Sequence, residues 1–258
     1  MSYLQELLTS THARVAEARS KISDDALEQR IASVPAPRGF RRALQDDDEV
    51  SIIAEIKRAS PSKPSLREDL DAAPLARAYA DGGAAAVSVL TEPDRFKGSI
   101  EDLQAATGAG LPVLRKDFIL DLFQVQESRA IGADALLLIV RVLGNELDDL
   151  LRATTALGMD ALVEVYDEVD VERALAAGAN LIGINHRDLE TFEVDPRRTA
   201  KLAPSIPDGI TIVGLSGVSS RGDVEAMREA GAHAVLVGES LVTAADPAAK
   251  LRELRGVA

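Results

Sequence analysis

The clearest signal of the fold is residues 131–140, which read IGADALLLIV. In this stretch a glycine follows a helical segment, and a short apolar run follows the glycine. The same order recurs in GGAAAVSVL (82–90), AGANLIGIN (177–185) and AGAHAVLVG (230–238). A glycine at this point lets the chain leave a helix in the left-handed conformation and enter a strand. We therefore expect left-handed turns at Gly83, Gly132, Gly178 and Gly231.

Eight apolar runs of this kind follow one another, and amphipathic stretches separate them. The expected strands are 51–56, 85–90, 112–115, 134–140, 161–165, 181–184, 211–214 and 234–237. Strands that are almost wholly apolar are typical of a parallel sheet covered on both faces. Eight strand–helix units in 258 residues fit a closed barrel, which needs about 250. No G-x-G-x-x-G motif follows the first strand, which argues against an open dinucleotide-binding sheet. We predict an α/β protein with the (β/α)8 TIM barrel fold.

About 50 residues precede the first strand. Apolar residues at helical spacing predict a helix over residues 4–22, and Phe40 with Leu44 predicts a second, short helix. The acidic run 46–49 is expected to form a solvated turn. No linker rich in Ser, Gly or Pro divides the chain, so we expect one domain over residues 1–258. Residues 1–50 would form an N-terminal helical extension packed on the barrel.

Composition excludes several classes of function. Cysteine is absent, which rules out disulfides, thiolate zinc sites and cysteine nucleophiles. The formal charge of −13 disfavours binding to nucleic acid or to anionic lipid. No apolar window approaches the ~18 residues of a membrane span, and the start MSYLQELLTS does not resemble a signal peptide, so we expect a cytoplasmic protein. The three histidines, His12, His186 and His233, lie far apart, so we expect structural histidines and no metal site.

Polar residues end several of the predicted strands with side chains expected to point into the barrel. Catalytic groups of such barrels come from the C-terminal ends of the strands, and residues two apart point the same way. This parity turns Glu55 and Lys57 of the first strand inward, together with Lys116, Glu164 and Asn185 of the third, fifth and sixth. Two lysines and two carboxylates in a partly desolvated cup can supply an acid and a base near neutral pH. Taken singly, each residue could instead belong to a structural ion pair.

A phosphate site is expected where barrels of this kind usually have one, after strands seven and eight. Those strands lead into Ser216-Gly217 and Gly238-Glu239, where small residues allow backbone N–H groups to approach an anion. The loop 58–65 adds hydroxyl groups and a cation, including Ser60 and Lys63. It can serve as a mobile lid over the phosphate, or form a rigid, proline-stiffened surface loop.

Seven segments, in the same order along the chain, resemble the indole-3-glycerol-phosphate synthase family of tryptophan biosynthesis. They are 53–63 (IAEIKRASPSK), 88–92 (SVLTE), 114–118 (LRKDF), 137–140 (LLIV), 161–165 (ALVEV), 182–189 (IGINHRDL) and 234–241 (AVLVGESL). The resemblance implies a carboxy-lyase that closes the indole ring of 1-(2-carboxyphenylamino)-1-deoxyribulose 5-phosphate, with loss of carbon dioxide and water. It implies no metal and no organic cofactor. For partners it implies this small phosphorylated substrate and association with other tryptophan-pathway enzymes, and we expect a monomer or a weak dimer.

The resemblance also implies residue roles. Lys116 would be the general acid at the ribulose carbonyl, Lys57 would bind the anthranilate carboxylate, and Glu164 would act in dehydration. Glu55 and Asn185 would hold substrate hydroxyls and orient the lysines. The implied substrate-binding residues are Ser60, Lys63, Phe118, Leu137, Arg187, Ser216, Gly217, Leu236, Gly238 and Glu239.

The chain departs from the family pattern at three positions, of which the mildest is His186 in place of a commoner small or amide residue. Leu215 stands where the family usually has an inward-pointing glutamate, and Pro64 follows Lys63 where the family has glycine. Leu215 leaves open a weakly active or non-catalytic relative that binds the same ligand. A sugar-phosphate isomerase on the same barrel is a third interpretation, against which the Glu55/Lys57 pair and the Lys116 segment argue.

Overall fold

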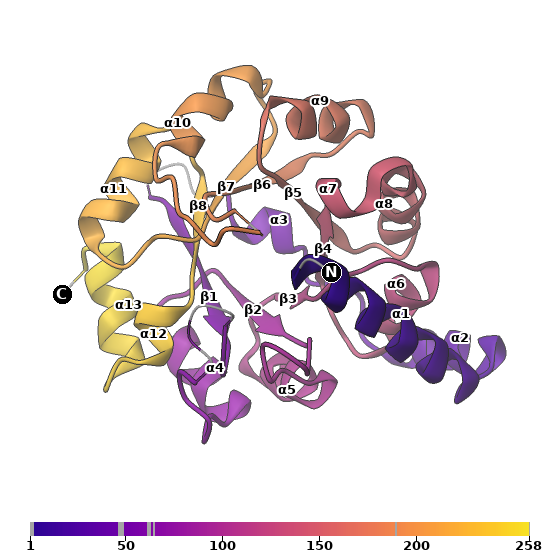
Figure 1. Ribbon diagram of the computed structural model, residues 1–258. Coiled ribbons are helices and arrows are strands. Elements are labelled where there is room, and N and C mark those ends of the chain that lie inside the picture. The colour runs from indigo at the N-terminus through magenta and orange to yellow at the C-terminus, as the bar shows by residue number, and fades with distance from the viewer. Residues whose placement is uncertain (1–2, 46–48, 61–62, 64, 189, 258) are drawn as a thin grey trace.

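The computed structural model describes residues 3–45, 49–60, 63, 65–188 and 190–257. Its eight strands pair in parallel in the order β1 to β8, and β1 pairs with β8, which closes the barrel. Figure 1 looks onto this barrel inside its ring of helices. The strands are β1 (Ser51–Ile56), β2 (Ala86–Leu90), β3 (Val113–Lys116), β4 (Ala135–Ile139), β5 (Asp160–Val165), β6 (Leu181–Asn185), β7 (Thr211–Leu215) and β8 (Ala234–Val237). The predicted (β/α)8 barrel is therefore confirmed.

Three strands run one residue further toward their C-terminal ends than predicted. β3 ends at Lys116, β6 at Asn185 and β7 at Leu215, because backbone pairing continues one residue past each expected end. Leu90 pairs with Lys116, and Asn185 pairs with Leu215. The polar side chains of Lys116 and Asn185 are thus held by the sheet itself, which positions them more firmly than a loop would.

The helices of the barrel lie outside the strands. They are α4 (Ala72–Asp81), α5 (Ile100–Ala106), α6 (Leu122–Ala130), α7 (Val140–Leu143), α8 (Leu147–Ala156), α9 (Glu168–Ala176), α10 (Arg198–Leu202), α11 (Arg221–Glu229), α12 (Glu239–Val242) and α13 (Pro247–Arg255). Alternation splits the core in two. Ile52, Ala54 and Ile56 pack in the outer layer with helix residues, whereas Ile53 packs in the interior layer with Leu114 and other inward residues. The predicted parity of β1 is correct.

The glycine turns are also as predicted. Gly83, Gly132, Gly178 and Gly231 have φ angles of 84°, 90°, 86° and 92°, in the left-handed region. Each stands between a helix and the following strand. A residue with a side chain is strained in that conformation, so the repeated glycine marks the turn between each of these helices and the strand that follows it.

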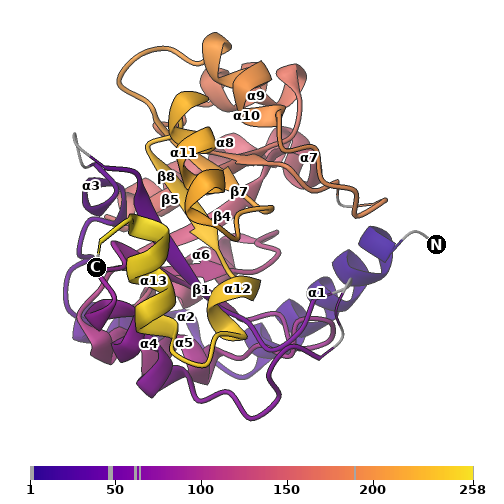
Figure 2. The ribbon, with the colours of Figure 1, turned by 90° about the vertical axis from the view of Figure 1, so that its left-hand side faces the viewer.

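The N-terminal residues contact both ends of the barrel. α1 (Tyr3–Ser20) lies across the C-terminal ends of the strands, α2 (Asp24–Ser33) packs on α6, and α3 (Phe40–Ala43) lies at the opposite end (Figures 1 and 2). Leu7 of α1 and Phe40 of α3 both belong to the interior apolar layer. In α3, Arg41 donates from its backbone N–H to Asp160 at the start of β5, over 2.9 Å. The expected helix over 4–22 thus begins and ends slightly earlier, and the expected short helix is α3.

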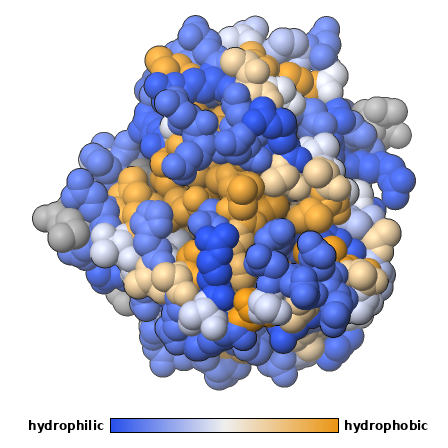
Figure 3. Space-filling view, turned by 90° about the vertical axis from the view of Figure 1, so that its right-hand side faces the viewer, coloured by the Kyte–Doolittle hydropathy of each residue, from blue (hydrophilic) through white to orange (hydrophobic). Residues whose placement is uncertain are grey.

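The helices leave some apolar surface uncovered. On the face seen in Figure 3, apolar residues gather in a band across the middle, with hydrophilic residues above and below it. Among the helices of the described ranges, none is long and apolar enough to cross a membrane. Most of the acidic run expected as a solvated turn, residues 46–48, lies outside the described residues.

Candidate active site

The five predicted catalytic side chains meet in one cavity at the C-terminal ends of the strands. The cavity has a volume of about 330 Å³, and Glu55, Lys57, Lys116, Glu164 and Asn185 all line it. Ser60, Arg187, Ser216, Gly217, Leu236, Gly238 and Glu239 line it as well. Phe118 and Leu137 line a smaller adjoining cavity of about 60 Å³, which shares Lys116, Glu164 and Asn185 with the first. The structure therefore brings together the five residues predicted from the alternation of side chains along the strands.

Glu55 and Lys57 form an ion pair on the β1 side of the cavity. Glu55 is only 3% exposed, and burial alone would raise its pKa. The nearby ammonium groups of Lys57 and Lys116, with Arg187, outweigh burial and lower the pKa of Glu55 below its ordinary value. Glu55 is therefore a carboxylate at neutral pH, held against Lys57.

The opposite wall carries a chain of polar groups from β5 to β7. Asn185 Nδ2 donates to Glu164 Oε1 over 2.9 Å, and Asn185 Oδ1 accepts from Ser216 Oγ over 3.0 Å. Asn185 Oδ1 also accepts from the Arg187 backbone N–H over 3.0 Å, so the orientation of the amide is fixed. Burial raises the pKa of Glu164, although Lys116 and the Asn185 hydrogen bond oppose the change. Asn185 thus orients the carboxyl group that burial makes easiest to protonate.

The pKa values of the two buried carboxyl groups move in opposite directions. That of Glu55 is lowered and that of Glu164 is raised, although Lys116 interacts with both. Two carboxyl groups separated in this way can take different proton-transfer roles at one pH. The cavity can therefore hold an anionic group near Lys57 while Lys116 and Glu164 exchange protons with a bound molecule.

The ends of β7 and β8 provide the small residues expected of an anion site. Ser216 and Gly217 both have positive φ angles, 69° and 83°. A serine in this conformation is strained, and such strain clusters at functional sites. Gly238 has an ordinary φ, but a Cβ added there would lie 3.0 Å from Lys57 Nζ and closer still to the Glu55 carboxylate. Gly238, directly after β8, thus makes room for the Glu55–Lys57 pair.

The loop after β1 is tied to the β8 end of the site. Ser60 and Lys63 exchange two backbone hydrogen bonds of 2.8 and 3.0 Å. Lys63 does not line the cavity but forms an ion pair with Glu239. Residues 61, 62 and 64 lie outside the described residues, so the roles expected of this loop as a lid and of Pro64 stay predictions.

Leu215 points into the barrel, as its parity predicted. It is 2% exposed, belongs to the interior apolar layer and lines the cavity. A Cβ added at Gly183 would lie 2.8 Å from Leu215 Cδ1 and 3.2 Å from Leu162 Cδ1, so Gly183 makes room for both leucines. The position is therefore packed as an apolar one.

Some residues that line the cavity come from loops and were not predicted from the sequence. Phe96 follows β2, Phe192 follows β6, and both line the cavity. Phe192 has a positive φ of 61°, and its ring meets the ring of Tyr3 edge-on at 5.2 Å. Because both rings belong to loops, the alternation of side chains along a strand does not predict where they point. The only sequence signal that could have identified them is that aromatic residues are rare in this chain, at 3% of its residues.

The histidines lie away from the proposed chemistry. His186 is fully buried outside the cavity, and its Nε2 lies 2.7 Å from Thr199 Oγ1. Burial, reinforced by Arg198, lowers the pKa of His186 to about 4. His233 accepts from the backbone N–H of Ile212 over 3.0 Å, and His12 is exposed on α1. Within the described part of the chain, no group of three or more His, Asp or Glu residues is placed to hold a metal ion.

Comparisons with known proteins agree with this geometry. Residues 4–254 match the family model described as indole-3-glycerol phosphate synthase. A protein of that name from Mycolicibacterium vanbaalenii is 47% identical over 97% of this chain and 93% of its own length. Another from Micrococcus luteus is 46% identical over 99% of this chain and 97% of its own.

Solved structures share the fold at lower identity. A 3-hexulose-6-phosphate synthase has a TM-score of 0.64 at 18% identity, over 81% of this chain and all of that one. Thiamine phosphate pyrophosphorylase from Pyrococcus furiosus has a TM-score of 0.61 at 16% identity, over 80% of this chain and 94% of that one. These likenesses concern the barrel alone, whereas the family model and the close relatives cover nearly the whole sequence. The chain belongs to the indole-3-glycerol phosphate synthase family.

Proposed function

We propose that the chain converts 1-(2-carboxyphenylamino)-1-deoxyribulose 5-phosphate to indole-3-glycerol phosphate, releasing carbon dioxide and water. The single observation that carries the proposal is the cavity in which two lysines face two buried carboxyl groups of oppositely shifted pKa. Ring closure needs an acid at a carbonyl, and the following elimination needs an acid and a base together. The family of the chain supports the same reaction.

Each charged group has a role that its surroundings support. Lys116, at the end of β3, interacts electrostatically with both carboxyl groups and protonates the ribulose carbonyl as the ring carbon attacks. Lys57, held by Glu55, binds the substrate carboxylate that leaves as carbon dioxide. Glu164, oriented by Asn185, removes or returns the proton that dehydration requires. The reaction so described uses no metal and no organic cofactor.

The phosphate and the aromatic ring of the substrate fit different sides of the cavity. Ser216, Gly217, Gly238 and Glu239 lie at the ends of β7 and β8, where backbone N–H groups can bind a phosphate. Phe96, Phe118 and Leu137 offer apolar surface for the carboxyphenyl ring next to Lys116. A cytoplasmic location, one domain, a monomeric or weakly dimeric state and association with other tryptophan-pathway enzymes stay predictions.

Leu215 supports one alternative, a weakly active or non-catalytic relative that binds the same ligand. Loss of one auxiliary charged group can lower the rate by orders of magnitude while binding persists. The two possibilities differ in turnover and agree in ligand binding. Leu215 and Leu162 both pack beside Gly183, so the interior accommodates an apolar residue at position 215.

The test is turnover of the carboxyphenylamino substrate by the purified protein, followed by the fluorescence of the indole product. We expect turnover, and we expect Lys116→Met to abolish it. Lys201→Met, on the exposed face of α10, is the matched control and should retain full activity. A folded protein that binds the substrate or product without turnover would establish the alternative, and one that neither binds nor turns over would refute the proposal.

A further inference from the structure

The residue next to Lys116, Asp117, is a buried carboxylate that borders the smaller cavity but not the larger one. The Asp117 side chain is fully buried and accepts four hydrogen bonds. Thr91 Oγ1 donates over 2.7 Å, the Phe118 backbone N–H over 2.9 Å, Arg115 Nη2 over 3.3 Å and Arg14 Nη2 over 3.4 Å. Since Lys116 and Phe118 flank it in the chain and both line the substrate cavities, any shift of Asp117 also moves the site.

Three of the four donors, Thr91, Arg115 and Phe118, lie at or directly after the C-terminal ends of β2 and β3. Arg115 is itself fixed by Glu127 Oε2 at 2.9 Å and Ser128 Oγ at 3.1 Å, both on α6. Arg14 is different, because it comes from α1, more than one hundred residues earlier in the chain. It also contacts Thr11 Oγ1 of its own helix over 3.0 Å, which directs the guanidinium toward the barrel.

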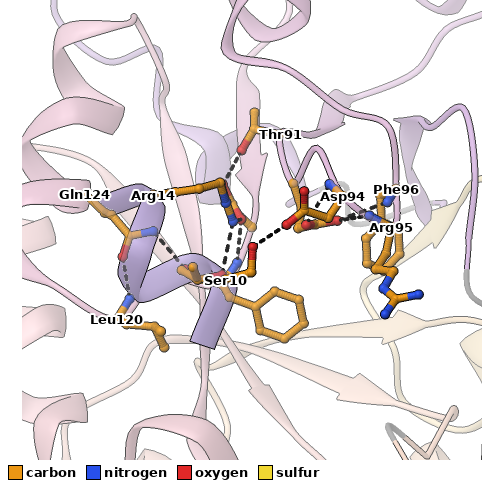
Figure 4. A network of polar contacts seen from close by, with 12 residues as sticks. Ser10, Arg14, Thr91, Asp94, Arg95, Phe96, Leu120 and Gln124 are labelled. Atoms are coloured by element: carbon orange, nitrogen blue, oxygen red, sulfur yellow. Dashed lines mark hydrogen bonds and ion pairs between the residues drawn. The ribbon is translucent and has the colours of Figure 1, made fainter. Parts of the chain in front are cut away.

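Other contacts hold α1 in place beside this group (Figure 4). Ser10 hydrogen-bonds to Asp94, and Arg95 forms an ion pair with Glu6 at 2.9 Å. The loop that receives α1 is stiff, since the buried Glu92 carboxylate accepts the backbone N–H groups of residues 94, 95 and 96. The helix is thus anchored on the loop after β2 while Arg14 reaches the loop after β3.

We propose that Arg14 is a positioning residue for Lys116: through Asp117 it fixes, from the N-terminal helix, the turn that carries the general acid. The inference rests on the proposed function, because it assigns Lys116 to the reaction. Asp117 carries its charge in a buried position, where two guanidinium groups neutralise it. Without Arg14, one cation remains, and the carboxylate gains by turning toward solvent or toward other donors. A displacement of the reacting group by about 1 Å can cost on the order of 100-fold in rate.

The experiment compares two substitutions on the same helix. Arg14→Met removes the contact with Asp117, whereas Arg19→Met removes the same charge from α1 at an exposed ion pair with Asp121. We expect Arg14→Met to lower kcat by about tenfold or more with KM within about twofold, and Arg19→Met to leave both unchanged. Should Arg14→Met fail to fold, Arg14→Gln removes the charge but keeps a donor.

A double-mutant cycle separates positioning from general destabilisation. If Arg14 acts through Asp117, adding Arg14→Met to Asp117→Asn should lower kcat by much less than Arg14→Met does alone. Equal kcat in Arg14→Met and Arg19→Met, a rise in KM alone, or fully additive losses in the cycle would overturn the inference. The wild-type protein is assayed in the same series. No turnover by wild type would refute the proposed function, whereas an active wild type matched by Arg14→Met would refute this inference alone.

Discussion

Replacing Gly238 by alanine tests how tightly the Glu55–Lys57 pair must be held. The added Cβ would lie 3.0 Å from Lys57 Nζ and 3.2 Å from Glu55 Cδ, and closer still to one carboxylate oxygen. All three contacts are shorter than the 3.4 Å at which ordinary van der Waals contact begins. Val237, the residue before Gly238, pairs with Ala54 of β1 and limits movement of the backbone, so relief must come mainly from the two side chains.

The expected cost follows from that forced movement. Overpacking a tight interior typically costs about 1–3 kcal/mol of stability. A displacement of the reacting groups by roughly 1 Å can cost on the order of 100-fold in rate. We therefore expect kcat/KM of Gly238→Ala to fall by about 100-fold, with a loss of unfolding free energy within the overpacking range.

The assay is steady-state formation of the indole product, with thermal unfolding measured on the same samples. Gly222→Ala is the matched control, because it adds the same methyl group on α11, where the nearest atom is 3.8 Å away. That variant should keep full activity and unchanged or slightly higher stability. If Gly238→Ala keeps the kcat/KM of the wild type, the Glu55–Lys57 pair tolerates displacement, and glycine at position 238 is not needed to hold the pair in place.

Three further predictions address the carboxyl groups, the interior and the buried histidine. In Asn185→Ala the loss of the hydrogen bond to Glu164 should raise the pKa of Glu164 further, so the acidic limb of the pH profile of kcat should move to higher pH. If this limb does not move, the ionisation of Glu164 is not what produces it. Leu215→Glu should lower the melting temperature and should not increase turnover, whereas a rise of tenfold or more would identify a weakly active relative. The pKa of His186, about 4 in the folded protein and about 6.5 when unfolded, means that its stabilising contribution is present above pH 6.5 and is lost as pH falls toward 4. At about 1.36 kcal/mol per pKa unit, this loss of unfolding free energy amounts to about 3 kcal/mol in the wild type and should be absent from His186→Gln. Denaturant titrations at several pH values measure it, and the same dependence of unfolding free energy on pH in both proteins would contradict the assignment.

The barrel and its inward residues were predictable because both follow from short-range periodicity. Side chains alternate along a strand, so the position of β1 in the sequence was enough to predict that Glu55 and Lys57 point inward. The pairing of the strands then brings Lys116, Glu164 and Asn185 to the same end without further information. Helix ends with left-handed glycines were equally local signals.

Loops and the N-terminal helix carry no such constraint. Phe96 and Phe192 reach the cavity because irregular segments fold over it, and no period in the sequence encodes their direction. The contact between Arg14 and Asp117 depends on how α1 docks on a barrel formed by residues far along the chain. The reason for glycine at position 238 was also hidden, since it depends on side chains of β1 that only barrel closure brings close.

Leu215 bears on how an acidic protein attracts an anionic substrate. The chain carries a net charge of −13, and its proposed substrate has a phosphate and a carboxylate. Within the cavity, Glu239 is paired with Lys63. The other charged groups that line it are the cations Lys57, Lys116 and Arg187 and the carboxylates Glu55 and Glu164.

The cavity therefore keeps an excess of positive charge, and the raised pKa of Glu164 favours that excess. An ionised glutamate at position 215, which lines the cavity, would cancel this excess. An apolar residue at this position thus preserves the attraction of the site for anions. If that is correct, KM should rise in Leu215→Glu but much less in Leu215→Gln, which has nearly the same shape without the charge. Equal KM values in the two variants would show that packing, not charge, determines the residue at this position.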